Sequence, residues 1–223
     1  MAEASLTRQL WGAIEDVYGA ILEHPFLRGL VTGDLAREAF LFYVIQDAHY
    51  LRDYARALAV CAARAPAEAD IQMFAEHAAG AIAVERELHE GLFADAGIAE
   101  AHVAGTPMAP TCLAYTSYLL ASVYGGSFAE ALGAVLPCYW IYQEVGTELG
   151  RCGSPEPLYQ RWIDTYRGEE FAAVVRAVIE LTDRLEPELS AAEMRRMTDR
   201  FRTTSRYEWM FWEMAWQRQG WPV

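Results

Sequence analysis

Apolar residues recur at intervals of three and four positions along almost the whole chain of 223 residues, and no segment alternates apolar and polar residues. This spacing places side chains on one face of an α-helix, whereas a strand requires a period of two. Short segments rich in glycine and proline, such as GTPMAP and GRCGSPEP, interrupt the pattern. The sequence therefore predicts an all-α, multi-helical bundle, and a single domain is the simplest organisation for residues 1–223.

Helix boundaries follow from capping residues and helix breakers. We expect a first helix that carries Leu10 to Ile21 on its apolar face and ends at HPFLRG. Ser190 and Glu193, three residues apart, form a capping-box pattern at the start of the last helix. In all, the periodicity predicts about eight helices. After the first, they are placed at about 35–65, 67–96, 111–124, 128–149, 157–166, 169–186 and 190–219.

The charge balance excludes several classes of function. The formal net charge is −13, and all 18 basic residues are arginine. An acidic surface repels phosphate backbones and anionic lipid headgroups, so we expect no nucleic-acid partner and no membrane binding. The absence of lysine rules out a lysine Schiff base, lysine-anchored pyridoxal phosphate and the usual P-loop.

The sequence also lacks targeting, disulfide and metal-binding patterns. Acidic residues near the N-terminus do not suit a signal peptide, and no apolar run approaches the ~18 residues of a membrane span. The four cysteines are far apart, without a CxxC pair. Glu85 and His89 are four residues apart, but neither E-x-x-H nor HExxH occurs. We expect a cytoplasmic protein with reduced thiols and with neither a metal nor another cofactor.

Two helices carry candidate binding residues. Asp47 and Tyr50, three residues apart within FYVIQDAHYL, share one helical face. A carboxylate among apolar residues is costly to bury without a partner, so Asp47 is either a binding group or a solvated or N–H-paired acid. Tyr115, Tyr118 and Ser122 form one stripe on a later helix, a pattern that core packing also explains.

The segment LPCYWIYQEVG places Cys138 directly after Pro137 and four residues before Tyr142, which shares its helical face. A helical cysteine is commonly a small buried hydrophobe. Proline inside a helix costs about 3 kcal/mol, because it removes a backbone donor and crowds the preceding turn. We expect Pro137 to break the helical run, so that Cys138 meets a ligand at a kink where a thiolate is favoured.

The last expected helix contains Glu208 among Tyr207, Trp209 and Phe211. Glu213 follows five residues later, about 140° around the helix, so at most one of the two acids faces the core. Apolar surroundings raise a carboxyl pKa, which suits a proton shuttle near neutral pH. The alternative is a surface glutamate.

Several segments occur in the order and spacing of one known family: HPFLRG, FYVIQDAHYL, YTSYLL, GSFAEALGAVLPCYWIYQEVG, YQRWIDTYRGEEF and SRYEWMFWEMAW. Over residues 5–221 the chain resembles the thiaminase II (TenA) family, and LPCYWIYQEVG resembles its cysteine-containing branch. The resemblance implies a heme-oxygenase-like fold without heme, assembled as a homotetramer. It also implies an aminopyrimidine aminohydrolase, which converts 4-amino-5-aminomethyl-2-methylpyrimidine to the 5-hydroxymethyl compound and ammonia in thiamin salvage. Thiamin is split by the same chemistry.

The resemblance also implies roles for individual residues. It makes Cys138 the nucleophile, Glu208 the acid/base and Asp47 the residue that holds the aminopyrimidine. The pocket tyrosines that it implies are Tyr50, Tyr115, Tyr142 and Tyr166. The chain departs from the family at His49, which replaces an aromatic residue. Because neighbouring helical positions point about 100° apart, we expect His49 to face away from the Asp47 site.

Two alternative functions remain open. The first is a cofactorless or metal-dependent oxidase similar to pyrroloquinoline quinone synthase, which would need clustered basic residues, whereas the candidates here are acids, a thiol and phenols. The second is a non-catalytic regulator or thiamin-precursor-binding protein. Direct DNA contact lacks an electrostatic basis at a net charge of −13.

Overall fold

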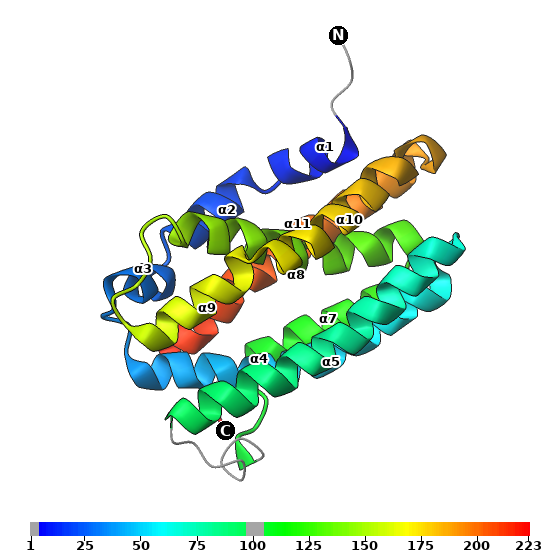
Figure 1. The fold of residues 1–223 in the computed structure, drawn as a ribbon. Helices are drawn as coiled ribbons and strands as arrows, with labels where there is room; N and C mark the ends of the chain where they lie inside the picture. The colour runs from blue at the N-terminus through cyan, green and yellow to red at the C-terminus, as the bar shows by residue number, and fades with distance from the viewer. Residues whose placement is uncertain (1–4, 97–104) are drawn as a thin grey trace.

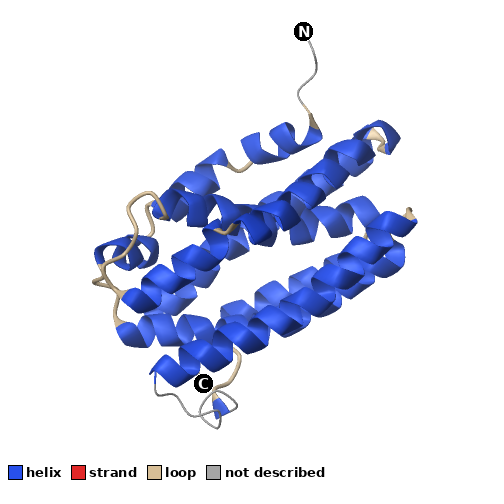
Figure 2. Ribbon diagram, in the orientation of Figure 1, coloured by secondary structure: helices blue, strands red, loops and turns tan. Residues whose placement is uncertain are grey.

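The computed structural model describes residues 5–96 and 105–223, without the side chains of 84–90 and 92–96. These residues form helices and no strand (Figure 2), which confirms the predicted all-α fold. The elements are α1 (Leu6–Gly12), α2 (Glu15–Leu22), α3 (Pro25–Thr32), α4 (Arg37–Arg64), α5 (Glu68–Ala96), α7 (Pro110–Gly125), α8 (Phe128–Leu149), α9 (Pro157–Arg167), α10 (Glu169–Leu185), the 3-10 helix η1 (Glu186–Glu188) and α11 (Ala191–Gln217).

The N-terminal region contains more helices than the periodicity predicted. The single helix expected there is divided into α1 and α2, because Ile14 leaves the helical conformation at φ −125° and ψ 8°. HPFLRG was expected to end a helix, but it begins α3 instead. His24 Nδ1 accepts a hydrogen bond from the Phe26 N–H at 3.1 Å, and Pro25 takes the first helical position, where no donor is needed. With these changes the described ranges contain ten α-helices, so the expected number of about eight was too low.

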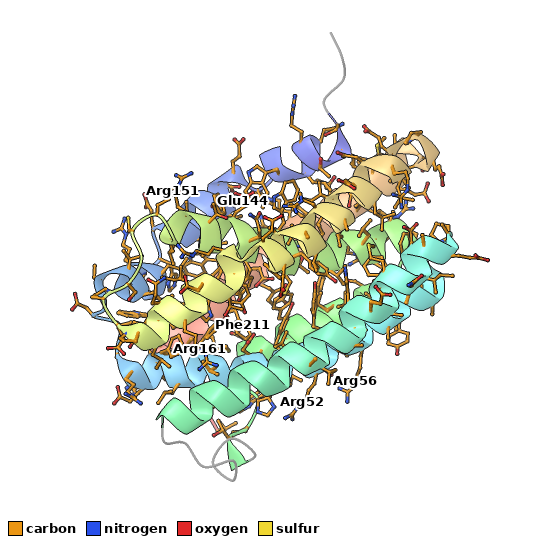
Figure 3. The ribbon with its side chains drawn as sticks, viewed as in Figure 1. Arg52, Arg56, Glu144, Arg151, Arg161 and Phe211 are labelled. Atoms are coloured by element: carbon orange, nitrogen blue, oxygen red, sulfur yellow. The ribbon has the colours of Figure 1, made fainter. Side chains whose placement is uncertain are left out.

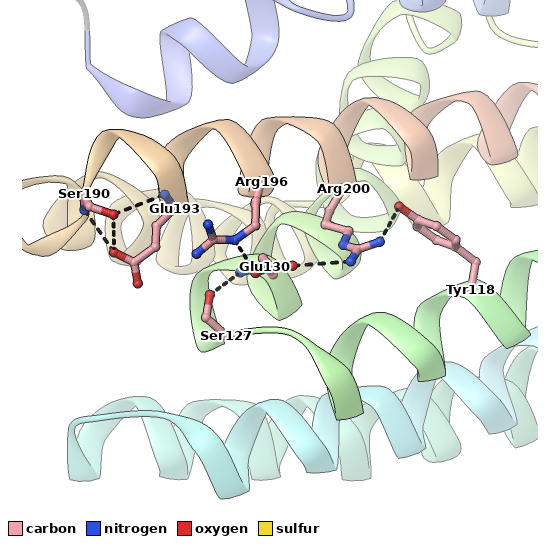
Figure 4. A network of polar contacts seen from close by, with 7 residues as sticks. All are labelled: Tyr118, Ser127, Glu130, Ser190, Glu193, Arg196 and Arg200. Carbon is pink, nitrogen blue, oxygen red and sulfur yellow. Dashed lines mark hydrogen bonds and ion pairs between the residues drawn. The ribbon is translucent and has the colours of Figure 1, made fainter.

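The other boundaries agree closely with the sequence prediction, and the capping box at the start of α11 is confirmed. Ser190 Oγ accepts a hydrogen bond from the Glu193 N–H at 3.2 Å, while Glu193 Oε2 accepts one from the Ser190 N–H at 3.0 Å (Figure 4). No helix within the described residues combines the length and the apolar character that a membrane crossing requires.

The long helices pack as two pairs that share a core. α4 packs along α5, and α8 packs along α11, with α7 lying against α4, α8 and α11. In Figure 1, α9 and α10 run across α8, while α1 and α2 lie on the side of the bundle away from α5. Since α4, α7, α8 and α11 all contact one another, their inward faces meet in the interior.

Glycines allow the closest approaches to α8. A Cβ atom on Gly133 would lie 2.5 Å from the carbonyl oxygen of Met197, which is on α11. A Cβ on Gly146 would lie 2.6 Å from the carbonyl carbon of Tyr166, which is on α9. Both distances are too short for any side chain, so glycine is required for α11 and α9 to lie this close to α8.

A polar network also joins α8 to α11, close in sequence to the contact between Gly133 and Met197 (Figure 4). Glu130, buried in the first turn of α8, accepts hydrogen bonds from Arg196 Nε at 2.8 Å and Arg200 Nη2 at 3.3 Å. Arg200 Nη1 also donates to Tyr118 Oη of α7 at 3.1 Å. Two arginines on one buried carboxylate compensate its desolvation and keep its pKa below the usual value.

Substituting Gly133 tests this packing. Gly133→Ala should lower the free energy of unfolding by about 1–3 kcal/mol, because the added methyl forces α8 and α11 apart. Gly80→Ala is the control, since a Cβ there has no neighbour within 4 Å. Alanine at that α5 position should raise the free energy of unfolding by up to about 1 kcal/mol through its helix propensity. Urea denaturation of the two variants measures both effects, and equal stabilities would contradict the packing argument.

Candidate active site

Pro137 does not interrupt α8, so the predicted break was wrong. The helix continues through Pro137, and every residue from 129 to 137 is buried. Proline costs about 3 kcal/mol in a helix interior, whereas each fully buried large apolar side chain contributes about 1.5–3 kcal/mol. Because α8 contacts α4, α7, α9, α10 and α11, its packing outweighs the local cost of the proline. Cys138 is therefore presented on the side of a continuous helix, not at a helix start.

Cys138 lies half-buried beside two tyrosines of α4. The side chains of Tyr50 and Tyr54 lower the pKa of its thiol. The Tyr54 hydroxyl donates its hydrogen bond to the Val135 carbonyl oxygen at 2.9 Å. Burial is the larger effect and, with the negative charge of Glu208, holds the pKa well above its usual value. Cys138 is consequently a neutral thiol at neutral pH, and an attacking thiolate requires that its proton be accepted by a neighbour.

Glu208 is the buried carboxyl group of α11, with a side chain that is 1% exposed. Tyr115 Oη of α7 donates a hydrogen bond to Glu208 Oε1 at 2.5 Å. Burial raises the pKa of Glu208 to about 8, with a further increase from the charge of Asp47, although the Tyr115 hydrogen bond acts in the opposite direction. Such a group exchanges protons near neutral pH, as a general acid/base must.

The prediction that only one of the two α11 acids faces the core is confirmed. Glu213 has a side chain that is 37% exposed, and its Oε2 lies 3.1 Å from His24 Nε2. Glu208 is the acid that faces the interior, and the alternative of a surface glutamate at position 208 is excluded.

Asp47 and Tyr50 are both buried on the same face of α4, as their spacing predicted. The Tyr50 ring lies 4.9 Å from that of Tyr115 and 5.5 Å from that of Tyr54, between ring centroids. Its hydroxyl oxygen is buried and has no hydrogen-bond partner among the described residues. The charge of Asp47 raises the pKa values of both Cys138 and Glu208.

Tyr142 and Tyr166 extend the cluster toward α9. Their ring centroids are 4.9 Å apart, and the Trp212 ring of α11 lies 5.2 Å from that of Tyr142, also between centroids. Tyr43 Oη donates a hydrogen bond to Tyr142 Oη at 3.2 Å. Phe211, labelled in Figure 3, packs in the interior against Tyr43, with 5.7 Å between ring centroids.

Five helices therefore bring the seven predicted site residues to one region. They are Asp47 and Tyr50 from α4, Tyr115 from α7, Cys138 and Tyr142 from α8, Tyr166 from α9 and Glu208 from α11. Sequence reasoning missed Tyr43 and Tyr54, although each lies four residues from Asp47 or Tyr50 along α4. That helical spacing was the signal that could have identified them.

His49 faces away from this region, as expected. Its Nε2 lies 3.0 Å from the carbonyl oxygen of Thr106, in the segment that precedes α7. Among the described side chains, no three His, Cys, Asp or Glu residues come together in a way that could hold a metal ion. The side chains of Glu85 and His89 lie outside the described residues.

Comparison with known proteins identifies the family. Residues 11–218 match the TENA/THI-4/PQQC family. The chain belongs to this family. It is 39% identical over 199 residues to the aminopyrimidine aminohydrolase of Bacillus subtilis, covering 89% of this chain and 84% of that protein. It is 42% identical over 220 residues to the thiamine biosynthesis multifunctional protein ThiED of Corynebacterium efficiens, covering 96% of this chain but only 29% of that longer protein.

Solved structures agree with this membership of the TENA/THI-4/PQQC family. A TenA homologue from P. horikoshii OT3 superimposes with a TM-score of 0.87 at 31% identity, covering 96% of this chain and 99% of that one. A domain with a heme oxygenase-like fold from Shewanella denitrificans gives a TM-score of 0.75 at 14% identity, covering 97% of this chain and 94% of that one. The predicted heme-oxygenase-like fold is confirmed.

The raised pKa of Glu208 has a measurable consequence for the stability of this family member. The ordinary pKa is 4.5 and the native one about 8, so between these values the native state binds more protons than the unfolded state. The free energy of unfolding should therefore fall as pH rises through this window, by up to about 1.4 kcal/mol per unit. Glu208→Gln removes this dependence and keeps an acceptor for Tyr115.

Urea denaturation at about pH 5 and about pH 8 tests this expectation. Glu208→Gln should gain stability relative to the wild type at the higher pH. Glu180→Gln, on the exposed face of α10, is the matched control and should not diverge from the wild type. A constant difference between Glu208→Gln and the wild type would show that Glu208 is ionised throughout.

Proposed function

We propose that the protein is an aminopyrimidine aminohydrolase of the thiaminase II type. It would hydrolyse 4-amino-5-aminomethyl-2-methylpyrimidine to the 5-hydroxymethyl compound and ammonia, and would split thiamin at the same carbon. The observation that carries the proposal is the buried, protonatable Glu208, whose charge raises the pKa of the Cys138 thiol, among buried tyrosines. The Bacillus subtilis relative that bears this activity as its name supports it.

The residues around the pair suit a flat, electron-poor heterocycle. The rings of Tyr50, Tyr142 and Tyr166 offer faces on which a pyrimidine can stack. Asp47, buried on the same side, would accept a hydrogen bond from the exocyclic 4-amino group of the substrate. An acceptor fixed at this position selects for an amino group over a carbonyl, because two acceptors would repel each other.

Cys138 Sγ then attacks the ring carbon next to N1. Because the resting thiol is neutral, ionised Glu208 accepts the thiol proton and delivers it to N1, and no net charge is created. The aminomethyl group, protonated as an ammonium, leaves the electron-rich adduct as ammonia, and an exocyclic methylene remains. Water adds to this carbon and loses one proton to Glu208, which passes it to the ammonia. The N1 proton then returns to the departing sulfur, so that the thiol is regenerated and aromaticity is restored. The sum is replacement of the amino group by the hydroxyl of water.

The environment of the pair disfavours the oxidase alternative. Apart from burial and the effect of Glu208 on Cys138, the groups that most affect the pKa values of these two residues are tyrosine hydroxyls and Asp47. An acidic, phenolic surrounding does not attract a polyanionic quinone precursor. Assembly as a homotetramer and a location in the cytoplasm stay predictions of the sequence.

Replacement of the nucleophile tests the proposal. Cys138→Ser should reduce ammonia release from the aminomethylpyrimidine, and cleavage of thiamin, by at least about 1000-fold, since a serine hydroxyl is hard to ionise in this site. Circular dichroism should stay helical. Cys152→Ser, at an exposed cysteine, should retain wild-type rates. Full activity of Cys138→Ser would exclude covalent catalysis at this residue, and release of neither product by the wild type would reject the function.

The pH profile tests the role of Glu208. Because the ionised form accepts the thiol proton, kcat/KM should rise with pH through about 8, the pKa of Glu208. Tyr115→Phe removes the hydrogen bond that lowers this pKa, so the rising limb should move to higher pH. Tyr118→Phe, which affects a hydroxyl bound to Arg200, should leave the limb in place. A limb that is identical in Tyr115→Phe and the wild type would assign it to another group.

A further inference from the structure

The first turn of α7 is capped by side chains from distant parts of the chain. Its N-cap residue, Ala109, offers no side-chain acceptor, whereas Ser127 and Ser190 cap α8 and α11 from within their own sequence. The first N–H groups of a helix have no partner within it and are satisfied from outside. Alanine is among the poorest N-cap residues. At α7 the partners come instead from α4 and from the segment that follows α11.

Gln46 is the contribution of α4. Its side chain is buried, Oε1 accepts a hydrogen bond from the Ala109 N–H at 2.8 Å, and Nε2 donates one to the Pro107 carbonyl oxygen at 3.0 Å. The Gln46 carbonyl oxygen accepts a further bond from the Cys112 thiol at 3.5 Å. One residue of α4 therefore holds the chain before, at and after the start of α7, at positions 61 to 66 residues away in sequence.

Residues that follow α11 hold the same turn. Gln219 Oε1 accepts a hydrogen bond from the Thr111 N–H at 3.1 Å, and Trp221 Nε1 donates one to the Met108 carbonyl oxygen at 3.0 Å. In Figure 1, the C-terminus lies beside the segment that leads into α7. The two glutamines thus satisfy the N–H groups on either side of Pro110, which has none of its own.

The anchored turn leads directly to Tyr115. Along the interface of α4 and α7, Gln46 contacts Cys112 and, one turn further, Tyr50 contacts Tyr115 with 4.9 Å between ring centroids. Thr111 and Tyr115 are four residues apart and lie on one face of α7. Because a helical turn is closed by its own backbone hydrogen bonds, the position of Tyr115 depends on where the start of α7 is fixed.

Tyr115 uses this position to donate a hydrogen bond to Glu208 Oε1 at 2.5 Å. Hydrogen bonds weaken steeply as their geometry departs from the optimum, so a small displacement of the phenol matters. We propose that Gln46 and Gln219 are positioning residues, which fix α7 so that Tyr115 donates to Glu208 with this short geometry. The inference rests on the proposed use of Glu208 as the acid/base, and both glutamines act through Tyr115.

The expected consequence is a contribution to the proton affinity of Glu208. Burial raises the pKa of Glu208, the Tyr115 hydrogen bond lowers it, and the charge of Asp47 raises it. A weaker Tyr115 bond should therefore raise this pKa. Neither glutamine is charged, so replacing it by an uncharged residue alters only the geometry. The other titratable groups around Glu208 belong to α4 and α8 and stay in place: Asp47, Tyr50, Tyr54, Cys138 and Tyr142.

The experiment compares Gln219→Leu and Gln46→Met with the wild type. Each removes the acceptor for one N–H group at the start of α7 and keeps a similar side-chain volume. Gln219→Glu keeps the acceptor, and its added charge is on a partly exposed side chain that salt screens. Gln217→Leu is the matched control, because the exposed Gln217 donates to Glu213 within α11. The rising limb of kcat/KM for the aminomethylpyrimidine is measured for each variant, alone and combined with Tyr115→Phe.

Gln219→Leu and Gln46→Met should each move the limb to higher pH by at least about 0.3 unit, which is about a twofold change in proton affinity. Gln219→Glu and Gln217→Leu should keep the limb of the wild type. In the Tyr115→Phe background neither Gln219→Leu nor Gln46→Met should move the limb further, because the bond that they weaken is already absent.

A limb that is unchanged in both Gln219→Leu and Gln46→Met would overturn the proposal, as would a movement that persists in the Tyr115→Phe background. If Gln46→Met does not fold, the comparison of Gln219→Leu with Gln219→Glu decides alone. Failure of the proposed function has a different signature. Urea denaturation at a series of pH values, with each variant compared with its Glu208→Gln double variant, follows the same pKa without turnover. A wild type that releases no ammonia, but in which Gln219→Leu raises this pKa, would reject the hydrolase and leave the positioning role standing.

Discussion

The close contact of α8 with α11 at Gly133 places the reactive groups of the molecule. Cys138 and Glu208 are on different helices, and each helix carries its group about one to three turns from the point where Gly133 meets Met197. The Glu130 ion pairs with Arg196 and Arg200 act at the same contact and limit sliding of one helix along the other. A change in this spacing would therefore separate the thiol from its acid.

Burial of this pair explains its chemistry. Water would ionise Glu208 at neutral pH and leave it a weak base, whereas the dry interior raises its pKa to about 8. The same desolvation keeps the Cys138 proton in place, and the negative charges of Glu208 and Asp47 raise the thiol pKa further. In the proposed mechanism, the proton therefore moves only when a substrate nitrogen is present to receive it. The native state loses stability by holding Glu208 in this environment, as is common where function and stability conflict.

The sequence was most informative where a pattern is local. The period of three and four residues predicted the helices, and the 128–149 range of α8 is reproduced in full. The local cost of Pro137 and the apparent stop at HPFLRG led to wrong predictions, because tertiary packing and a first-turn proline decide those cases. The links from His77 to Tyr139 and from Tyr43 to Tyr142 join residues 62 and 99 positions apart, and no single sequence encodes such pairs by spacing.

Among the described residues, tyrosines, and not basic residues, surround the Cys138 thiol, and this choice keeps the pKa of Glu208 high. An arginine beside this pair would stabilise the Cys138 thiolate, but it would also stabilise the Glu208 carboxylate and lower the pKa that the proton transfer needs. Tyrosines avoid this conflict, because burial holds the pKa values of Tyr50, Tyr54 and Tyr115 well above the usual value and keeps them neutral. A neutral hydroxyl can turn its single proton toward whichever neighbour carries the charge at a given step. In the proposed reaction, tyrosines would thus assist sulfur and carboxylate in turn without a fixed positive charge.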